Sequence, residues 1–267
     1  MTSDFIATSI ARRLMARIHS SHDRRRIGVF AGPPGIGKTT AIDALSGQLA
    51  GAMVVVKISR RNAREVMVLR HVLEGLRGLA GSRSHHASTS VWELRSDIFN
   101  AACAWAGVDA SAARRGEVAQ ARFPRLTIVF DEAQNLSREA IESLRFWNDA
   151  DRCYGPFPLG LVFVGNNEFS LQTDVDGRSV ISAAVADRAL YVQTFDYGDV
   201  TDDDVRLYVE ARGIVDEGAV QTLIDYLDAA RVSRSFRRIQ DLIYEINDAA
   251  NAGPVTASVV REVLAIA

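Results

Sequence analysis

The sequence predicts an α/β protein in which a central, mostly parallel sheet of five strands is followed by a small helical region. Three observations lead to this prediction. Short apolar runs rich in branched and aromatic residues alternate with segments of helical spacing up to about residue 200. A glycine-rich stretch lies directly between the first of these runs and a helical segment. Beyond about residue 200 only helical patterns remain, so we expect the last helices to form a separate layer or lobe.

The composition narrows the class of protein. With 267 residues, the chain can hold one large α/β domain and a small helical one. Its 48% hydrophobic and 24% charged residues are typical of globular proteins. The longest apolar runs are far shorter than the roughly 20 residues that cross a bilayer, and the N-terminus lacks a secretory signal. Because Cys103 and Cys153 have no metal-ligand spacing, we expect no zinc site. The short apolar runs lead us to expect no membrane contact, and the two cysteines suit a reducing, cytoplasmic location.

The first half of the chain is expected to alternate helices and strands. Apolar residues at helical spacing predict an amphipathic helix over residues 4–20, which leads into a strand at 27–31. There follow a helix through 41–45, a strand at 52–58, a helix at 63–79 and a helix from Ser90 to Trp105. Residues 107–122 are poor in apolar side chains, so a loop with a short helical piece is expected there.

The second half begins with strands and ends with helices. A strand begins at Leu126, a helix carries Ile141, Leu144 and Trp147, and further strands are expected at 159–164 and 190–194. Helices are predicted at about 201–212, 217–230, 235–250 and 257–266. The acidic run at 202–204 suits a helix start, and Thr256 is expected to cap the last helix.

The glycine-rich stretch has the pattern of a phosphate-binding loop, Gly-x-x-x-x-Gly-Lys-Thr. It comprises Gly32, Pro33, Pro34, Gly35, Ile36, Gly37, Lys38, Thr39 and Thr40. Glycines let backbone N–H groups turn toward a polyphosphate, and the N-terminus of the following helix adds positive potential. Lys38 would then reach the β- and γ-phosphates, and the hydroxyl of Thr39 would ligate Mg²⁺.

A second motif is the apolar strand from Leu126 that ends in Asp131 and Glu132. A phosphate-loop enzyme needs an acid that holds Mg²⁺ and a second acid that polarises the attacking water. We assign Asp131 to the metal and Glu132 to the water, as general base. The alternative, a capping Asp131 with a solvated Glu132, stays open from the sequence alone.

A third position is the polar tip of the strand at 159–164. Asn166 could hydrogen-bond the γ-phosphate or orient the lytic water, with Asn167 as the alternate residue. Two asparagines that simply form a turn remain an alternative.

These motifs together resemble the AAA+ ATPases. More narrowly, the segments 129–136 (Val-Phe-Asp-Glu-Ala-Gln-Asn-Leu) and 163–167 (Phe-Val-Gly-Asn-Asn), with the helix through Leu144 and Arg145, resemble the DNA-transposition ATPases typified by the B protein of phage Mu. The similarity spans roughly residues 25–250. It implies an N-terminal helix (1–24), a three-layer phosphate-loop (P-loop) AAA+ core (25–198) and a helical lid (199–267).

The resemblance also implies ATP and Mg²⁺ as cofactors and a homo-oligomer, a ring or a helical filament, with ATP at the subunit interfaces. An arginine from one subunit would stabilise phosphate charge in its neighbour. Its position before the last core strand makes Arg188 the candidate and Arg178 the reserve, unless Arg188 only caps a helix end. A lid arginine would reach back to the nucleotide. Arg237 fits best, Arg234 and Arg238 compete, and a solvated helix face is the alternative.

Nonspecific double-stranded DNA and a transposase or recombinase are the partners that the resemblance implies. The net charge is only −2, but residues 57–83 carry seven basic side chains against two acidic ones. Arg60, Arg61 and Arg64 are the leading DNA contacts because they cluster within one predicted helical turn, although a solvated face would look the same. No helix-turn-helix module fits before the first strand, so the contacts are expected from the ATPase body.

Other function classes compete with DNA delivery to a recombinase, in which hydrolysis would end the assembled state. An AAA+ motor that acts on protein partners, such as a secretion or assembly ATPase, shares the Asp-Glu-Ala-Gln run. A nucleotide-gated switch with little turnover is a further alternative. A replication initiator or clamp loader would need a winged-helix domain, and a helicase would need a second motor domain; neither is expected in this sequence.

Overall fold

The computed structural model describes residues 5–61, 63–81, 90–119, 122–149, 159–171, 179–230, 232–251 and 253–265. The chain divides into two compact units. The sheet unit comprises Met15–Ala31 and Ile42–Thr194, and the loop-and-lid unit comprises Met1–Leu14, Gly32–Ala41 and Phe195–Ala267. A search of the described residues finds no helix that is long and apolar enough to cross a membrane.

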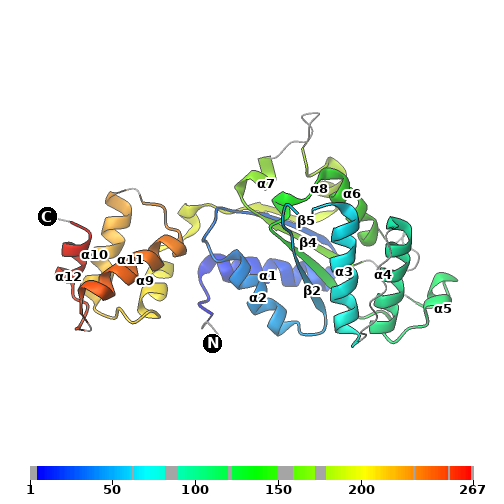
Figure 1. Ribbon diagram of the computed structural model, residues 1–267, viewed down its shortest axis with the longest axis horizontal. Helices are drawn as coiled ribbons and strands as arrows, with labels where there is room; N and C mark the ends of the chain where they lie inside the picture. Colours follow the sequence, from blue (N-terminus) through cyan, green and yellow to red (C-terminus); the bar gives the residue numbers. More distant parts are fainter. Residues whose placement is uncertain are drawn as a thin grey trace. The chain divides into compact units, whose positions relative to one another are not determined.

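The sheet unit is built on five parallel strands in the order β2-β3-β4-β1-β5 (Figure 1). The strands are β1 Ile27–Ala31, β2 Met53–Lys57, β3 Thr127–Asp131, β4 Gly160–Gly165 and β5 Ala189–Thr194. The predicted α/β fold is thus confirmed, and the sheet is entirely parallel instead of mostly so. Because all strands run the same way, Asp131 and Gly165 end neighbouring strands at the same edge, where β1 also ends.

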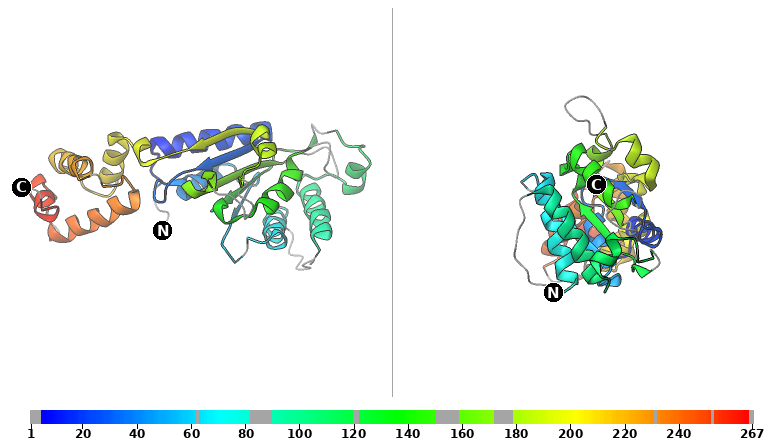
Figure 2. Two further views of the ribbon diagram at one scale, coloured as in Figure 1. Left: turned by 90° about the horizontal axis from the view of Figure 1, so that it is seen from above. Right: turned by 90° about the vertical axis from the view of Figure 1, so that its right-hand side faces the viewer.

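Helices cover both faces of this sheet (Figure 2). Alternate residues of the strands, such as Ile128 and Phe130 of β3, join one apolar core with α3 (Glu65–Leu79), α4 (Val91–Trp105) and α6 (Arg138–Arg145). On the other face, α1 (Ser9–Arg24) packs with its second half against the strands. There the imidazole Nδ1 of buried His22 lies 3.0 Å from the hydroxyl of buried Thr127. A parallel sheet buried on both faces explains why its strands read as continuous apolar runs.

Two helix starts differ from the predicted ones. α1 begins at Ser9 instead of residue 4 and continues to Arg24, beyond the predicted end at 20. It ends where Arg25 adopts a positive φ of 49°, which an α-helix does not continue through. α2 (Lys38–Gln48) begins inside the phosphate-loop motif, three residues before the predicted 41, so its first N–H groups belong to the loop.

Several short helices were missed by the apolar pattern because each has fewer than two full turns. They are α7 (Asn167–Leu171) and α8 (Ala183–Arg188), with 3₁₀ turns at Ala133–Asn135, Phe146–Asn148 and Tyr197–Asp199. The short helical piece expected in 107–122 is confirmed as α5 (Ala110–Arg114). Ser90 occupies the N-cap of α4, but its side chain makes no capping hydrogen bond.

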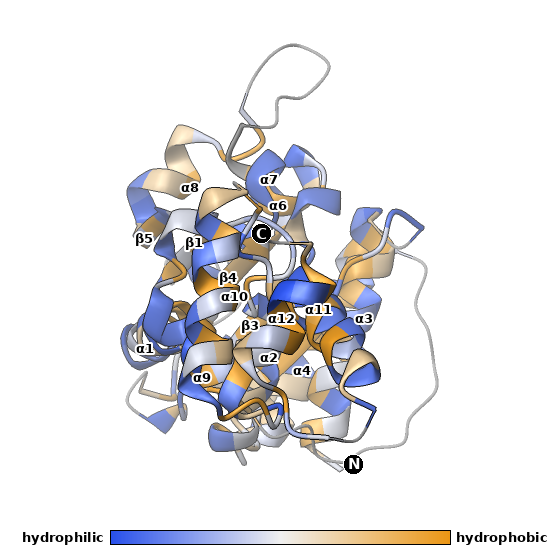
Figure 3. Ribbon diagram, turned by 90° about the vertical axis from the view of Figure 1, so that its left-hand side faces the viewer, coloured by the Kyte–Doolittle hydropathy of each residue, from blue (hydrophilic) through white to orange (hydrophobic). Residues whose placement is uncertain are grey.

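The loop-and-lid unit contains four helices after β5, as predicted: α9 (Asp202–Glu210), α10 (Glu217–Ala229), α11 (Phe236–Ala249) and α12 (Ala257–Val263). In Figure 3, α11 carries both hydrophobic and hydrophilic residues, and the buried ones include Phe236, Ile239, Leu242 and Ile243, as expected. Thr256 is the N-cap residue of α12, as predicted, but its hydroxyl lies 2.8 Å from that of Ser258 and makes no capping hydrogen bond to a helix N–H.

Asp204 ties the N-terminal residues of this unit to α9. Its carboxylate is buried and accepts hydrogen bonds from the backbone N and the hydroxyl of Ser9 at 2.6 and 2.5 Å. The same carboxylate closes a capping box with Thr201, which begins α9. A single acidic side chain therefore fixes both the start of α1 and the start of α9.

Candidate functional site

The phosphate loop holds its shape through two left-handed glycines. Gly35 and Gly37 have φ values of +80° and +89°, which favour glycine. A Cβ on Gly35 would lie 2.1 Å from the hydroxyl of Ser235, so glycine is also required there by close approach. The loop is bound to the lid because the backbone N of Phe236 donates to the carbonyl of Gly35 at 2.8 Å.

The ammonium group of Lys38 lies over its own loop. It donates to the carbonyls of Gly32 and Pro33 at 2.7 and 2.8 Å. Tyr197, which follows β5, donates to the carbonyl of Pro34 at 3.1 Å. The loop is therefore held by its own lysine and by a tyrosine that follows β5 in the chain.

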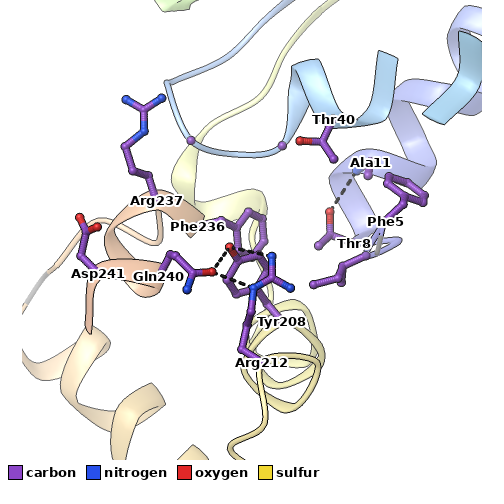
Figure 4. Close-up of a pocket in the computed structure, with 13 residues that line it drawn as sticks. Phe5, Thr8, Ala11, Thr40, Tyr208, Arg212, Phe236, Arg237, Gln240 and Asp241 are labelled. Carbon is purple, nitrogen blue, oxygen red and sulfur yellow. Dashed lines mark hydrogen bonds between the residues drawn. The ribbon is translucent and has the colours of Figure 1, made fainter. Parts of the chain in front are cut away.

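A cavity of about 340 Å³ lies beside the loop, within the loop-and-lid unit (Figure 4). It is lined by N-terminal residues (Phe5, Ile6, Thr8, Ala11), loop residues (Gly35, Gly37, Thr40) and lid residues (Tyr208, Arg212, Phe236, Arg237, Gln240, Asp241). Apolar and aromatic walls with a few polar groups are typical of a small-molecule site. The cavity begins where the two left-handed glycines expose the loop backbone, so phosphates and an attached aromatic group could bind at the same place.

Three lid side chains form a fixed wall of this cavity (Figure 4). The amide oxygen of Gln240 accepts from the hydroxyl of Tyr208 at 3.0 Å and from Nε of Arg212 at 2.8 Å. The Arg212 guanidinium also lies 4.6 Å from the centroid of the Tyr208 ring, a cation–π distance. Tyr208 in turn packs on Phe236, with ring centroids 4.8 Å apart. Sequence reasoning missed this wall because Tyr208 of α9, Arg212 in the turn after it and Gln240 of α11 are connected by no local spacing.

The three candidate lid arginines differ in their surroundings. Arg237 is exposed and lines the cavity. Arg234 is engaged within the lid: it pairs with Asp202 at 2.5 Å and Asp228 at 2.6 Å and donates to the carbonyl of Val200. These acceptors raise the pKa of Arg234 above its ordinary value against the opposing effect of burial. Arg238 is exposed and does not line the cavity. The surroundings therefore favour Arg237 as the lid arginine that meets a ligand.

In the sheet unit, the strand β3 ends in the two predicted acids. Asp131 is buried, and its Oδ1 accepts from the backbone N of Glu132 at 3.0 Å. Glu132 has a left-handed backbone with φ 60° and ψ 38°, which is uncommon for a residue with a side chain and occurs at functional sites. This turn directs the chain away from the strand line immediately after Asp131.

The side chain of Gln134 connects Glu132 with the tip of β4. Its Nε2 donates to the Glu132 carboxylate at 2.6 Å, and its Oε1 accepts from the backbone N of Asn166 at 3.0 Å. The orientation of the amide follows from its partners, since a carboxylate only accepts and a backbone N–H only donates. The structure thus brings together Glu132 and Asn166, and it does so through a residue that the sequence analysis gave no role.

Asn166 also lies directly before α7 and bonds its first turn. Its Oδ1 accepts from the backbone N of Glu168 at 3.0 Å, and its Nδ2 lies 3.3 Å from the Glu168 carboxylate. The turn-forming alternative therefore describes part of what this asparagine does. Asn167, the alternate residue, is the exposed first residue of α7.

Arg188 is the last residue of α8 and directly precedes β5, as predicted. Its guanidinium pairs with Asp149 at 3.4 Å and donates to the carbonyl of Ala184 at 3.3 Å. It lines a polar cavity of about 350 Å³ together with Arg24, Arg25, Arg26, Asn148, Asp149 and Asp187. Arg178, the reserve candidate, lies outside the described residues.

The leading DNA candidates do not lie on a helix face. α3 begins at Glu65, so Arg60 and Arg61 belong to the turn before it and Arg64 is its N-cap. The prediction that they share a helical turn is wrong, because the chain stays extended at Arg64, with φ −70° and ψ 141°. All three side chains are exposed, and they make no ion pair or hydrogen bond with any described residue.

The donor set suits Mg²⁺ better than a protein-enclosed metal. Among the described residues, no group of three or more His, Cys, Asp or Glu side chains could hold a metal ion. Mg²⁺ in phosphate-transfer sites is usually held by one or two protein oxygens together with phosphates and waters. The hydroxyl of Thr39 and the carboxylate of Asp131, the ligands that the sequence predicts, are oxygen donors of this kind.

A comparison with protein families and one with solved structures both find similar proteins. The model of the family described as AAA domain (AAA_22) matches residues 21–172, more than half of the chain. No curated protein matches the chain.

Similar solved structures share the fold at low identity. Cdc6p from Pyrobaculum aerophilum aligns with a TM-score of 0.60 and 15% identity, over 98% of this chain and 69% of that one. The RuvB Holliday junction branch migration motor of Thermotoga maritima aligns with a TM-score of 0.51 and 13% identity, over 99% and 71%. Drosophila ORC bound to AT-rich DNA and Cdc6 gives 0.51 and 13%, over 91% and 38%.

Proposed function

Because the chain belongs to the AAA domain family and is therefore an ATPase, we propose that it binds duplex DNA without sequence preference when ATP is bound, oligomerises there and regulates a transposase or recombinase. ATP hydrolysis would end the assembled state. The proposal rests on three groups of residues: those around the cavity beside the phosphate loop, the acids that follow β3, and the arginines at positions 60, 61 and 64.

The cavity beside the phosphate loop carries the nucleotide part of the proposal. Backbone N–H groups at the start of α2 and the ammonium of Lys38 suit the phosphates. The aromatic wall around Tyr208 and Phe236 suits a stacked base, and exposed Arg237 would add positive charge near the phosphates. On binding, Lys38 would exchange two carbonyl acceptors of its own loop for phosphate oxygens, a stronger, charge-assisted interaction.

Hydrolysis is assigned to the acids that follow β3. Bound Mg²⁺ would neutralise phosphate charge, with Thr39 and Asp131 as its protein ligands by motif. Glu132 would accept the proton of the attacking water, and the hydrogen bond from Gln134 fixes the rotamer of its carboxylate. Asn166 would orient the water or the γ-phosphate, since Gln134 holds its backbone as well. For Arg188 we propose a role on the nucleotide of a neighbouring subunit, which would require it to leave Asp149.

The single observation that carries the DNA part is the exposed, unpaired trio Arg60, Arg61 and Arg64. Arginines with no acidic partner within the described chain can replace counterions on phosphates without first breaking an ion pair. Contacts of this kind bind the backbone and read no bases. Two structural neighbours are named for DNA structures or DNA complexes, which supports DNA as the partner class. The transposase or recombinase partner rests on the resemblance of segments 129–136 and 163–167 to transposition ATPases.

A binding experiment with a random-sequence duplex tests the proposal. Affinity and particle size are measured together with no nucleotide, with ADP and with a slowly hydrolysed ATP analogue. Large DNA-bound assemblies only with the analogue, and affinity that falls steeply with salt, are the expected result. Nucleotide-dependent assembly that is indifferent to DNA would instead support a protein-directed motor or switch. Unchanged affinity between low and high salt would show that Arg60, Arg61 and Arg64 do not bind DNA phosphates.

A further inference from the structure

Trp92 is a large aromatic side chain that the fold leaves in solvent. It is 65% exposed, whereas Trp147 is buried at 1% and Trp105 donates from its indole nitrogen to the carbonyl of Gly51. No hydrogen bond or ring contact is found for Trp92 among the described residues. A single exposed aromatic side chain does not by itself require a partner. Its exposed ring face is nevertheless available to stack on a base, and the charges around it decide which ligand it suits.

The position of Trp92 follows from the packing of α3 with α4, which lie side by side (Figure 1). Near the start of both helices, Arg95 of α4 pairs with Glu65 of α3 at 3.3 Å. Toward their other ends, Gly75 of α3 lies close to Val54 at the start of β2, and Trp105 of α4 donates to the carbonyl of Gly51 just before β2. The two helices are therefore parallel, and their N-termini lie at the same end. Trp92 is three residues before Arg95, about one turn nearer that end.

The same end carries the three free arginines. Arg64 is the residue directly before Glu65, and Arg60 and Arg61 occupy the turn before it. Glu65 does not neutralise them, because its carboxylate already accepts from Arg95 and from the hydroxyl of Ser143. Exposed Glu93 adds one negative charge beside Trp92, so the surface stays net positive. An aromatic platform thus lies at the same end of the helix pair as the arginines.

We propose that Trp92 and the arginines at positions 60, 61 and 64 form a binding surface for single-stranded or locally unpaired DNA, in which an unpaired base stacks on the indole. This inference rests on the proposed DNA-binding function and extends it to a second state of the ligand. Arginines supply attraction to any DNA backbone, duplex or single-stranded. A ring face, in contrast, needs a base whose own face is free, and bases in an intact duplex are stacked on each other.

Trp92 and the arginines should therefore contribute in different ways. The arginine contribution depends on salt, because each phosphate contact releases counterions. The stacking contribution is nearly independent of salt and is lost when the strand has no bases. This difference separates an aromatic stacking site from a general basic patch.

The test compares three fluorescent ligands of equal length in the presence of the ATP analogue: oligothymidine, an abasic strand with the same phosphates, and a duplex. The variants are Trp92→Ala, Trp92→Phe, the triple replacement of Arg60, Arg61 and Arg64 by Ala, and Tyr244→Ala. Tyr244 is 62% exposed on α11 and serves as the matched control for loss of an exposed aromatic side chain. Because Trp92 is mostly in solvent, its removal should leave the melting temperature nearly unchanged.

Trp92→Ala should weaken oligothymidine binding about 5- to 100-fold with an unchanged salt slope. Binding of the abasic strand and of the duplex should change less than about twofold, Trp92→Phe should restore most of the affinity, and Tyr244→Ala should have no effect. The triple arginine variant should lower the salt slope for the single strand by about 2.

Two results would overturn the inference while the proposed function stands: equal loss of duplex and single-strand affinity in Trp92→Ala, or no loss in either. Loss of nucleotide-dependent self-assembly in Trp92→Ala without DNA would assign the indole to a subunit interface and would also overturn it. If the wild-type protein binds none of the three ligands under any nucleotide condition, the proposed function itself fails, and the inference fails with it.

Discussion

Gln134 donates a hydrogen bond to the carboxylate of Glu132 at 2.6 Å, and the opposite atom of the same amide receives the backbone N–H of Asn166. One side chain thereby fixes the acid after β3 relative to the tip of β4. The contact matters because a general base acts only from within hydrogen-bond reach of the water it activates.

Replacement of Gln134 tests this positioning role. Gln134→Ala should lower kcat for ATP hydrolysis about 10-fold and leave nucleotide affinity nearly unchanged, because the Glu132 carboxylate loses a restraint but keeps its basicity. Asn135→Ala is the matched control: its side-chain amide donates to the carbonyl of Ile58 at 3.0 Å and makes no hydrogen bond to the side chain of Glu132 or to Asn166. An equal kcat loss in both variants would indicate general loosening of this turn.

Glu132→Gln should keep ATP binding and lower hydrolysis by about 10²- to 10⁴-fold, since the amide cannot accept the proton of the water. Lys38→Ala should instead abolish nucleotide binding. Binding is measured with a fluorescent nucleotide and turnover by phosphate release. Wild-type turnover in Glu132→Gln would remove Glu132 from the role of base.

Gly35→Ala and Gly37→Ala form a matched pair in the phosphate loop. Both force an alanine into a left-handed backbone, at a cost of about 1 to 2 kcal/mol. Only the Cβ at residue 35 meets a neighbour, the Ser235 hydroxyl, whereas residue 37 has open space around it. Gly35→Ala should therefore lower the melting temperature more. Equal shifts in a thermal unfolding experiment would show that the loop and Ser235 separate easily.

Arg188→Ala should abolish the part of the ATPase rate that rises with protein concentration, a loss of up to about 10³-fold if the arginine acts across a subunit interface. Asp149→Asn should keep that part or raise it, because Arg188 no longer has to leave a carboxylate at 3.4 Å. The rate is measured over a range of protein concentrations. A wild-type concentration dependence in Arg188→Ala would assign the residue to the end of α8 alone.

His22 should make the folded state sensitive to acid. Burial lowers the pKa of His22 below 6.5, against the opposing effect of Asp23. Its contribution to the free energy of unfolding is therefore complete above pH 6.5 and is lost as the pH falls through the lowered value, because the unfolded chain takes up the proton first. Urea unfolding of wild type should show a larger loss between pH 7.5 and 5.5 than unfolding of His22→Gln. Parallel losses would contradict this.

The sequence was sufficient to predict the sheet and the main helices because both leave local patterns of apolar residues along the chain. The five strands were all expected, since strands buried on both faces leave continuous apolar runs such as the one from Leu126. The predicted end of α1 was wrong because it depends on a single residue, Arg25 with its positive φ. Thr256 was correctly placed at the N-cap of α12, but its hydroxyl bonds Ser258 and no helix N–H. Periodicity does not report such single-residue choices.

The candidate site divides in the same way. The phosphate loop and the acids after β3 could be found because the residues that their chemistry requires are neighbours in the sequence. The roles of Gln134 and of the Tyr208–Gln240 pair could not be found in this way. Each depends on a hydrogen bond to a residue 32 positions away, which only the folded chain brings within reach. The three arginines were found by charge, but their place before α3 required the structure.

The hydrogen bond from the backbone of Phe236 to Gly35 makes the lid and the loop parts of one folding equilibrium. Nucleotide affinity should therefore report on the packing of residues that never meet the nucleotide. A cavity made deep in the lid, for example at Ile246, would lower the fraction of molecules whose loop is shaped for phosphate. The measured dissociation constant would rise in inverse proportion to that fraction, while the intrinsic contacts stayed the same. ATP would then act as a stabiliser of α11 as much as a substrate, and screening for lid-destabilising variants could be done by nucleotide titration alone.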